Sequence, residues 1–263
     1  VSRGLGDVYK RQVVAAAAGA KVVKHGNRAA SSKCGTADCF EALGLPLDLE
    51  PEQVAEVGNE CGIAFAFART FHPAMRFVGP VRAALGMPCV FNVLGPLTNP
   101  ASPKHMAVGC ANRAMSPIMA AVYAANGQTG MVYTSSEGLD EMAPTGPVSI
   151  WEFSNGKVTE SEFDPTVELG LDKVTVADLK GGEPELNAQL FRDFLAGKDV
   201  PFRTTALLNA ASAIVADGHQ VPADASLTER FKAAYAIAEE TVDSGKASAL
   251  LDQWITAAQS KKA

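Results

Sequence analysis

The chain has 263 residues, a length that fits one α/β domain or a large and a small lobe. Hydrophobic residues make up 47% of the chain and charged residues 20%, which supplies enough apolar material for a sizeable core. The net charge of −6 argues against a nucleic-acid partner, because phosphate binding needs a basic face. No run of eighteen apolar residues is present, so neither a transmembrane helix nor a membrane partner is expected.

The five cysteines predict reduced thiols. Their number is odd, and no pair has the Cys-x-x-Cys spacing that is typical of redox or zinc motifs. Disulfides accumulate in secreted proteins, and residues 1–12 (VSRGLGDVYKRQ) lack the apolar segment of a signal peptide. We therefore expect a cytoplasmic protein.

The first third of the chain alternates predicted helices with one predicted strand. Ser32 or Thr36 is expected to cap a helix that stops at Gly44. Pro51 is expected to open the next helix, because proline is favoured in a first turn. The predicted elements are a helix over 13–20, a strand over 20–26, and helices over 36–43, 51–71 and 78–85.

After residue 87 the pattern changes. Strand-type runs at 105–110 and 130–135 flank a predicted helix over 116–127, which is the β-α-β pattern of parallel strands. Residues 147–163 indicate antiparallel strands around a turn at 154–156. Further helices are predicted over 185–196, 203–217, 226–243 and 246–260. The sequence thus predicts an α/β fold, with a mainly parallel central sheet flanked by helices and a partial small helical domain.

Polar and cationic side chains crowd the segment VVKHGNRAASSKCGTAD, residues 22–38, directly after the first predicted strand. Open α/β sheets bind ligands at the carboxyl ends of parallel strands. Lys24 and Arg28 can meet phosphate oxygens, and the hydroxyls of Ser31, Ser32 and Thr36 can complete an anion cradle. A solvated polar loop followed by a helix cap is the alternative.

Three further segments carry candidate chemistry. Asp140 and Glu141 follow the strand-type run at 130–135, and adjacent carboxylates of this kind hold Mg²⁺ on phosphorylated substrates or simply form an acidic turn. Arg82 can pair with a substrate carboxylate or lie on a helix surface. His72 is either a loop histidine or a ligand contact. The Gly-Pro turn in 92–100 is a candidate pocket wall.

Taken together, these segments resemble anthranilate phosphoribosyltransferase, an enzyme family of tryptophan biosynthesis. The likeness runs from about residue 13 to the C-terminus and implies a fold of the nucleoside phosphorylase/phosphoribosyltransferase type. Pyrimidine nucleoside phosphorylases share that fold but have a different phosphate loop. The motifs, in family order, are KHGNRAASSKCGTAD, FHPAMRFVGPVRAALG, FNVLGPLTNP and GLDEMAPTGP.

The resemblance implies a role for each motif. Asp140 and Glu141 would bind Mg²⁺ on the pyrophosphate, and no residue would act as a covalent nucleophile. Anthranilate would contact Asn27, His25, His72 and Gly95, and its carboxylate would bind Arg82. Phosphoribosyl pyrophosphate would contact Lys24, His25, Gly26, Asn27, Arg28, Ser31, Ser32 and Thr36. The full-length parent would be a homodimer.

The family also has N-terminal helices, a strand and a Gly-Thr-Gly-Gly-Asp loop that wraps the pyrophosphate, and residues 1–12 do not match them. We therefore expect an N-terminally truncated chain with impaired activity and an unpaired strand edge. The expected division is a non-family junction (1–12), an α/β phosphoribosyl-pyrophosphate-binding domain (13–50 and 87–263) and the remainder of a small helical domain (51–86). A pyrimidine nucleoside phosphorylase and a non-catalytic binding module of the same fold are the alternatives.

Overall fold

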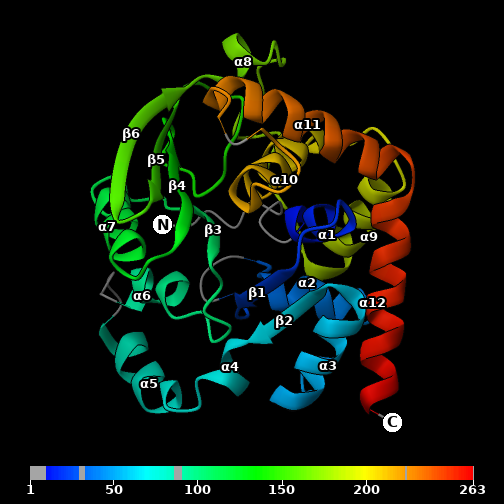
Figure 1. Cartoon of the computed structure of the whole chain (residues 1–263). Coiled ribbons are helices and arrows are strands. Elements are labelled where there is room, and N and C mark those ends of the chain that lie inside the picture. Colours follow the sequence, from blue (N-terminus) through cyan, green and yellow to red (C-terminus); the bar gives the residue numbers. More distant parts are fainter. Residues whose placement is uncertain (1–9, 30–32, 86–90, 223, 263) are drawn as a thin grey trace.

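The strands of the described residues form two sheets, and helices surround both (Figure 1). The structure is a computed structural model that describes residues 10–29, 33–85, 91–222 and 224–262. It confirms the α/β class with parallel strand pairs. The larger sheet also contains two antiparallel pairings, so its strands are not all parallel.

The smaller sheet pairs β1 (Val22–Gly26) with β2 (Ile63–Phe67) in parallel. The helices α2 (Thr36–Ala42) and α3 (Pro51–Cys61) connect them. The prediction of one helix over 51–71 is therefore wrong. Gly62, at φ +73°, ends α3, and the next five residues, Ile-Ala-Phe-Ala-Phe, are all buried against β1 as a strand. A short helix, α4 (Ala68–Phe71), then follows.

The larger sheet has the order β3-β4-β5-β6. The crossover helix α7 (Ser116–Ala125) joins β3 (His105–Gly109) to its parallel neighbour β4 (Thr129–Ser135), which confirms the predicted β-α-β unit. The antiparallel strands β5 (Val148–Ser154) and β6 (Lys157–Phe163) confirm the prediction for 147–163. Asn155 and Gly156 turn the chain with φ of 50° and 74°, values that suit asparagine and glycine.

Helix α10 (Arg203–Asp217) packs against α1 (Lys10–Ala17), α11 (Leu227–Asp243) and β3, and its apolar side chains belong to the main hydrophobic core. The four helices predicted after residue 184 are confirmed. Residues 92–100 were expected to form a turn, but the segment begins within α6, where Pro96 lies in the last turn and forfeits one intrahelical hydrogen bond. The remaining helices are α5 (Met75–Leu85), α6 (Phe91–Leu97), α8 (Pro165–Glu168), α9 (Pro184–Leu195) and α12 (Lys246–Lys262).

The first helix cap also differs from expectation. The N-cap of α2 is Gly35, and the carboxylate of Asp38 accepts the N–H of this residue at 2.9 Å. Gly44 ends the turn after α2 with φ of +97°, as predicted. Across the described ranges, no helix combines the length and apolar character that crossing a bilayer requires.

Candidate functional site

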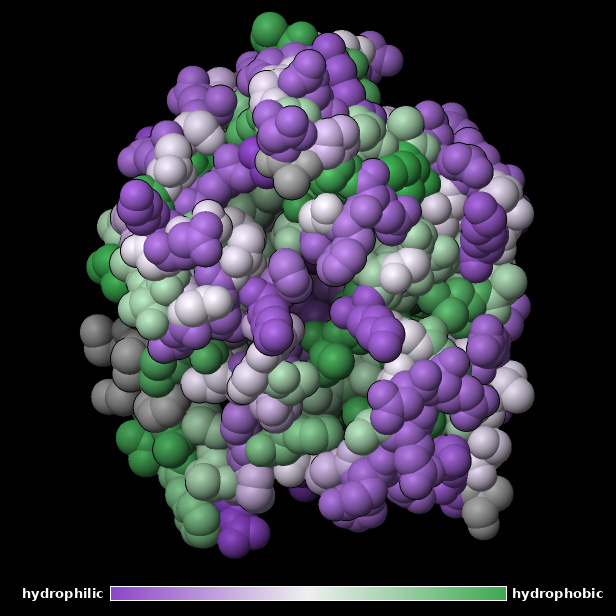
Figure 2. All heavy atoms as spheres, in the orientation of Figure 1, coloured by the Kyte–Doolittle hydropathy of each residue, from purple (hydrophilic) through white to green (hydrophobic). Residues whose placement is uncertain are grey.

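A cavity of about 1030 Å³ lies between β1 and β3. Residues of both strands line it, together with parts of α1, α4, α5, α6, α10 and the loop that carries Asp140. The space-filling view shows the molecule hollowed near its centre, with hydrophilic residues gathered around the hollow (Figure 2). The cavity is therefore walled by strand backbone and bordered by polar side chains.

Two strand edges face this cavity. Within the described residues β1 pairs only with β2, and β3 pairs only with β4. Side chains satisfy part of the exposed backbone: Asn99 Nδ2 donates to the carbonyl of Val23 at 3.1 Å, and Arg11 Nη2 donates to that of Ala107 at 3.4 Å. Among the described residues the expected unpaired edge is thus present on two strands, and polar side chains meet part of it.

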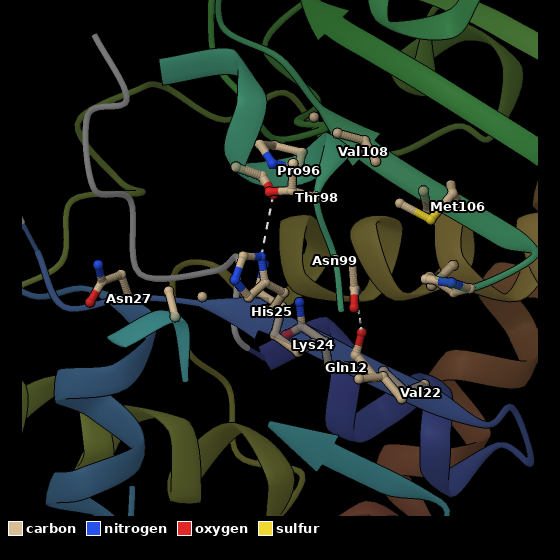
Figure 3. A pocket seen from close by; sticks show the side chains of 18 of the residues that line it. Gln12, Val22, Lys24, His25, Asn27, Pro96, Thr98, Asn99, Met106 and Val108 are labelled. Atoms are coloured by element: carbon tan, nitrogen blue, oxygen red, sulfur yellow. Dashed lines mark hydrogen bonds between the residues drawn. The ribbon is translucent and has the colours of Figure 1, made fainter. Parts of the chain in front are cut away.

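Lys24 lies on β1 and projects into the cavity, close to Gln12 and Asn99 (Figure 3). Burial among protein atoms and, next, the nearby Arg11 guanidinium lower the pKa of Lys24 to about 7, while Asp140 acts in the opposite direction. Asp140 also lines the cavity. A Cβ on Gly109 would meet the Asp140 carbonyl oxygen at 1.8 Å, so glycine is needed for the acidic loop to approach the end of β3 this closely.

His25, His72 and Gly95 meet on one side of the cavity. The two imidazole rings lie 4.7 Å apart in an edge-to-face arrangement. His25 Nδ1 lies 3.3 Å from the Gly95 carbonyl (Figure 3). Burial, then His72, lowers the pKa of His25 to about 4, so the ring is neutral near pH 7. A neutral His25 that donates from Nδ1 presents Nε2 as an acceptor, and this buried atom has no partner among the described residues.

Other candidate residues lie apart from the cavity. Arg28 makes two hydrogen bonds to Glu41, at 2.5 and 2.9 Å, and does not line the cavity. Glu141 is fully buried and is absent from the cavity wall. Thr36 begins α2, with its Cβ 3.6 Å from where a Cβ on Gly26 would lie. Gly26 and Asn27 do line the cavity.

Three predicted residues are described only in part or not at all. Ser31 and Ser32 lie outside the described residues. Arg82 belongs to α5, and its side chain lies outside the described part of the structure. Met75 and Arg76, earlier in the same helix, line the cavity.

Sequence reasoning missed four cations that line the cavity, namely Arg11, Lys21, Arg69 and Arg76. Each stands in or near a predicted helix, where lysine and arginine are common, so no local pattern marks it. The cavity consequently has more positive charge than the segment 22–38 alone supplies.

Sequence reasoning also missed Asn209, a fully buried residue of α10. Its Oδ1 accepts the N–H of Met142 at 3.0 Å, and its Nδ2 donates to the carbonyls of Met142 and Thr205 at 2.8 Å each. Tyr133 also donates to Oδ1 at 3.2 Å. Because Met142 follows Glu141 directly, Asn209 fastens the acidic loop to α10. The one available signal was an asparagine in the apolar run ALLNAASAIVA.

Comparisons with known proteins agree with one another. Residues 10–248 match the family described as "Glycosyl transferase family, a/b domain". The chain is 50% identical over 246 residues to the anthranilate phosphoribosyltransferase of Salinispora arenicola, covering 94% of this chain and 69% of that protein. A relative from Arthrobacter sp., also an anthranilate phosphoribosyltransferase, is 50% identical over 243 residues, covering 92% of this chain and 68% of that protein.

Solved structures give the same result. The crystal structure of the Thermus thermophilus anthranilate phosphoribosyltransferase superposes with a TM-score of 0.87 and 39% identity, covering 98% of this chain and 74% of that one. The Saccharomyces cerevisiae enzyme, in complex with phosphoribosyl pyrophosphate and Mg, superposes with a TM-score of 0.84 and 27% identity, covering 98% of this chain and 72% of that one.

Proposed function

This chain belongs to the anthranilate phosphoribosyltransferase family, and we propose that its cavity between β1 and β3 binds phosphoribosyl pyrophosphate and anthranilate. The reaction is transfer of the phosphoribosyl group to the anthranilate amine, giving N-(5-phosphoribosyl)anthranilate and pyrophosphate in tryptophan biosynthesis. One observation carries the proposal for the site: Lys24, His25, His72, Gly95 and Asp140 come from separate parts of the chain and line one cavity. The relatives favour this reading over a pyrimidine nucleoside phosphorylase or a binding module.

The leaving pyrophosphate needs positive charge around it, because negative charge develops as the bond to ribose C1 breaks. Lys24 supplies a cation that the anionic substrate would keep protonated. Asp140 fits a Mg²⁺ ion, since one carboxylate together with phosphate oxygens and water is a common magnesium environment. When bound, Mg²⁺ would neutralise charge on the leaving group. Glu141 is buried and does not line the cavity, and its role as a second metal ligand is a proposal.

The amine of anthranilate is a weak nucleophile, so its orientation matters more than its deprotonation. The neutral His25 presents Nε2 as an acceptor that can hold an amine N–H. With its pKa lowered to about 4, this imidazole is a weak base, which suits it for orienting the amine. His72 lies beside it, and Asn27 is at the end of the same strand. No step requires a covalent enzyme intermediate.

Calorimetric titration with phosphoribosyl pyrophosphate tests this proposal directly. We expect binding in the presence of Mg²⁺, and we expect Asp140→Asn to weaken it by at least about tenfold, since a metal ligand is lost. Glu137→Gln is the matched control, because Glu137 is an exposed carboxylate of the same loop that does not line the cavity. Equal affinity of the wild type and Asp140→Asn would contradict the proposed metal site. Absence of binding by a folded wild-type chain would contradict the proposed function.

Gly95→Ala separates the two substrates. Apart from its chain neighbours and the nearby backbone of α6, a Cβ on Gly95 meets no atom within 4 Å, so a methyl group fits there. Gly95 precedes Pro96, which disfavours helical backbone for a residue with a Cβ, so we expect no gain in stability. The added methyl group would narrow the proposed anthranilate side of the cavity, raising the KM for anthranilate without changing that for phosphoribosyl pyrophosphate. Steady-state kinetics with each substrate varied in turn will measure this. An unchanged anthranilate KM would remove Gly95 from the anthranilate path.

Several finer assignments are part of the same proposal. Arg82 would bind the anthranilate carboxylate, while Gly26, Arg28, Ser31, Ser32 and Thr36 would contact phosphoribosyl pyrophosphate. For Arg28 this requires release from Glu41, to which it is bonded here. We further propose a cytoplasmic homodimer, with residues 51–86 as part of a small domain. Strand β2 lies within that range and pairs with β1, so the two parts share a sheet.

A further inference from the structure

The carboxylate of Asp38 accepts backbone hydrogen bonds from Ala29, shortly after β1, and from Gly35, at the start of α2. We propose that Asp38 is a positioning residue, which fixes the Asn27 end of β1 for phosphoribosyl pyrophosphate. This inference rests on the proposed function of the cavity. Asp38 does not line the cavity, so it would act through the backbone that it holds.

One oxygen of Asp38 binds the backbone of both segments, while the other, Oδ1, accepts a longer hydrogen bond from Arg28 Nη1 at 3.4 Å. Asp38 Oδ2 accepts the N–H of Gly35 at 2.9 Å and the N–H of Ala29 at 2.8 Å. The bond to Gly35 serves the start of α2, since a carboxylate at the third helical position commonly reaches back to the N-cap. The bond to Ala29 has no such purpose, because Ala29 lies well before the helix. Helix capping therefore does not explain the bond between Asp38 and Ala29.

The backbone at Gly35 lies against the backbone at Arg28 and Ala29. A Cβ on Gly35 would lie 2.5 Å from the Ala29 nitrogen and 2.9 Å from the Arg28 carbonyl carbon. At these distances no side chain fits, so only glycine permits the approach. The Asp38 carboxylate thus holds these two stretches of backbone together, and its side chain is only 17% exposed.

Asn27 lies directly before Arg28 and on the wall of the cavity. Its backbone carbonyl accepts the N–H of Ala37 at 3.4 Å, and its Oδ1 accepts the N–H of Arg28 at 2.9 Å. The amide oxygen is therefore engaged by the chain, and the Nδ2 group is presented as a donor. Holding the Ala29 N–H restrains the Arg28–Ala29 peptide and therefore the position of Arg28. The N–H of Arg28, in the preceding peptide, in turn orients the Asn27 side-chain amide.

A second capping carboxylate in this chain provides a matched control. Glu229 accepts the N–H of Ser226 at 2.9 Å at the start of α11, does not line the cavity, and makes no hydrogen bond to a distant segment of the described chain. Both Asp38→Ala and Glu229→Ala remove a helix-capping carboxylate, so both should lower the Tm. If Asp38 did no more than cap α2, the two variants would affect ligand binding alike.

The experiment combines calorimetry with amide hydrogen exchange. With phosphoribosyl pyrophosphate and Mg²⁺ as the probe, Asp38→Ala should raise the Kd by about tenfold or more, because its two backbone hydrogen bonds are lost together with its contact to Arg28. Glu229→Ala should leave the Kd unchanged. Asp38→Asn should bind within about threefold of the wild type, since one amide oxygen can replace Oδ2 for both donors. In the ligand-free protein, the Ala29 amide should exchange faster in Asp38→Ala than in Glu229→Ala.

Wild-type affinity in Asp38→Ala, or an unaltered exchange rate at Ala29, would overturn the inference while leaving the proposed function in place. Absence of binding by the wild-type chain would instead reject the proposed function. The exchange rates in the ligand-free protein would then still decide whether Asp38 holds the Ala29 peptide.

Discussion

Asn209→Ala is expected to lower the free energy of unfolding by about 3 kcal/mol, the largest loss that we predict for a single polar residue here. The side chain is fully buried and makes four hydrogen bonds, to Met142, Thr205 and Tyr133. Alanine would leave the N–H and the carbonyl of Met142 buried without these partners, and an unsatisfied buried group costs more than a hydrogen bond gains. Urea denaturation of the two proteins will measure the difference.

The same substitution should also weaken Mg²⁺-dependent binding of phosphoribosyl pyrophosphate, because Met142 anchors the loop that carries Asp140. Asn187→Ala is the matched control. Asn187 is also buried, and it bonds the N–H of Gly182 at 2.9 Å and the carbonyl of Gly182 at 3.1 Å in a loop outside the cavity wall. Both variants should be destabilised, and only Asn209→Ala should lose Mg²⁺ dependence. An equal effect of the two on binding would show that Asn209 acts through global stability.

Local patterns predicted most of the elements but failed at one buried strand and at α6. The helices after residue 184 have clear periodicity and caps, so their existence and approximate limits could be predicted. The run Ile-Ala-Phe-Ala-Phe at β2 is apolar throughout, and a short apolar run does not distinguish a strand from a buried helix. Its pairing with β1, roughly forty residues earlier in the chain, decided the outcome.

The site shows the same limit. Motif order brought Lys24, His25, His72, Gly95 and Asp140 into one hypothesis, and all five line the cavity. The motif could not show that Glu41, thirteen residues away, bonds Arg28. Nor could it identify Asn209, whose partners come from β4 and the acidic loop. Residue types and local spacing predict which groups suit a ligand, whereas tertiary contacts determine which of them face it.

Lys24→Met is expected to stabilise the protein while weakening substrate binding. Half-burial in the cavity wall and the neighbouring Arg11 lower the pKa of this lysine from 10.5 to about 7. A shift of that size would correspond to almost 5 kcal/mol for a dry site. Because the side chain keeps contact with the cavity, we expect methionine to raise the free energy of unfolding by about 2 kcal/mol at pH 7. Lys21→Met, which removes an exposed lysine just before β1, should change it by less than about 0.5 kcal/mol.

The shifted pKa of Lys24 determines how the stability difference between Lys24→Met and the wild type changes with pH. The unfolded chain binds a proton at Lys24 up to pH 10.5, whereas the folded chain releases it near pH 7. The wild type therefore carries the full penalty below pH 7 and loses it as the pH rises toward 10.5. The difference in unfolding free energy between Lys24→Met and the wild type should be largest below pH 7 and should shrink as the pH rises above 7. Urea denaturation at pH 6, 8 and 10 will show this, and a difference that widens with pH would contradict the assignment.

The stability penalty is tied to the proposed function of this residue. An anionic substrate beside Lys24 would favour the ammonium form and raise its pKa, so binding near pH 8 should take up a proton. Calorimetry in buffers of different ionisation enthalpy will detect that uptake in the wild type, and Lys24→Met should lack it. The same variant should bind phosphoribosyl pyrophosphate at least about tenfold more weakly. A residue that destabilises the folded chain and strengthens ligand binding is expected in a binding site, where charge is arranged for the ligand.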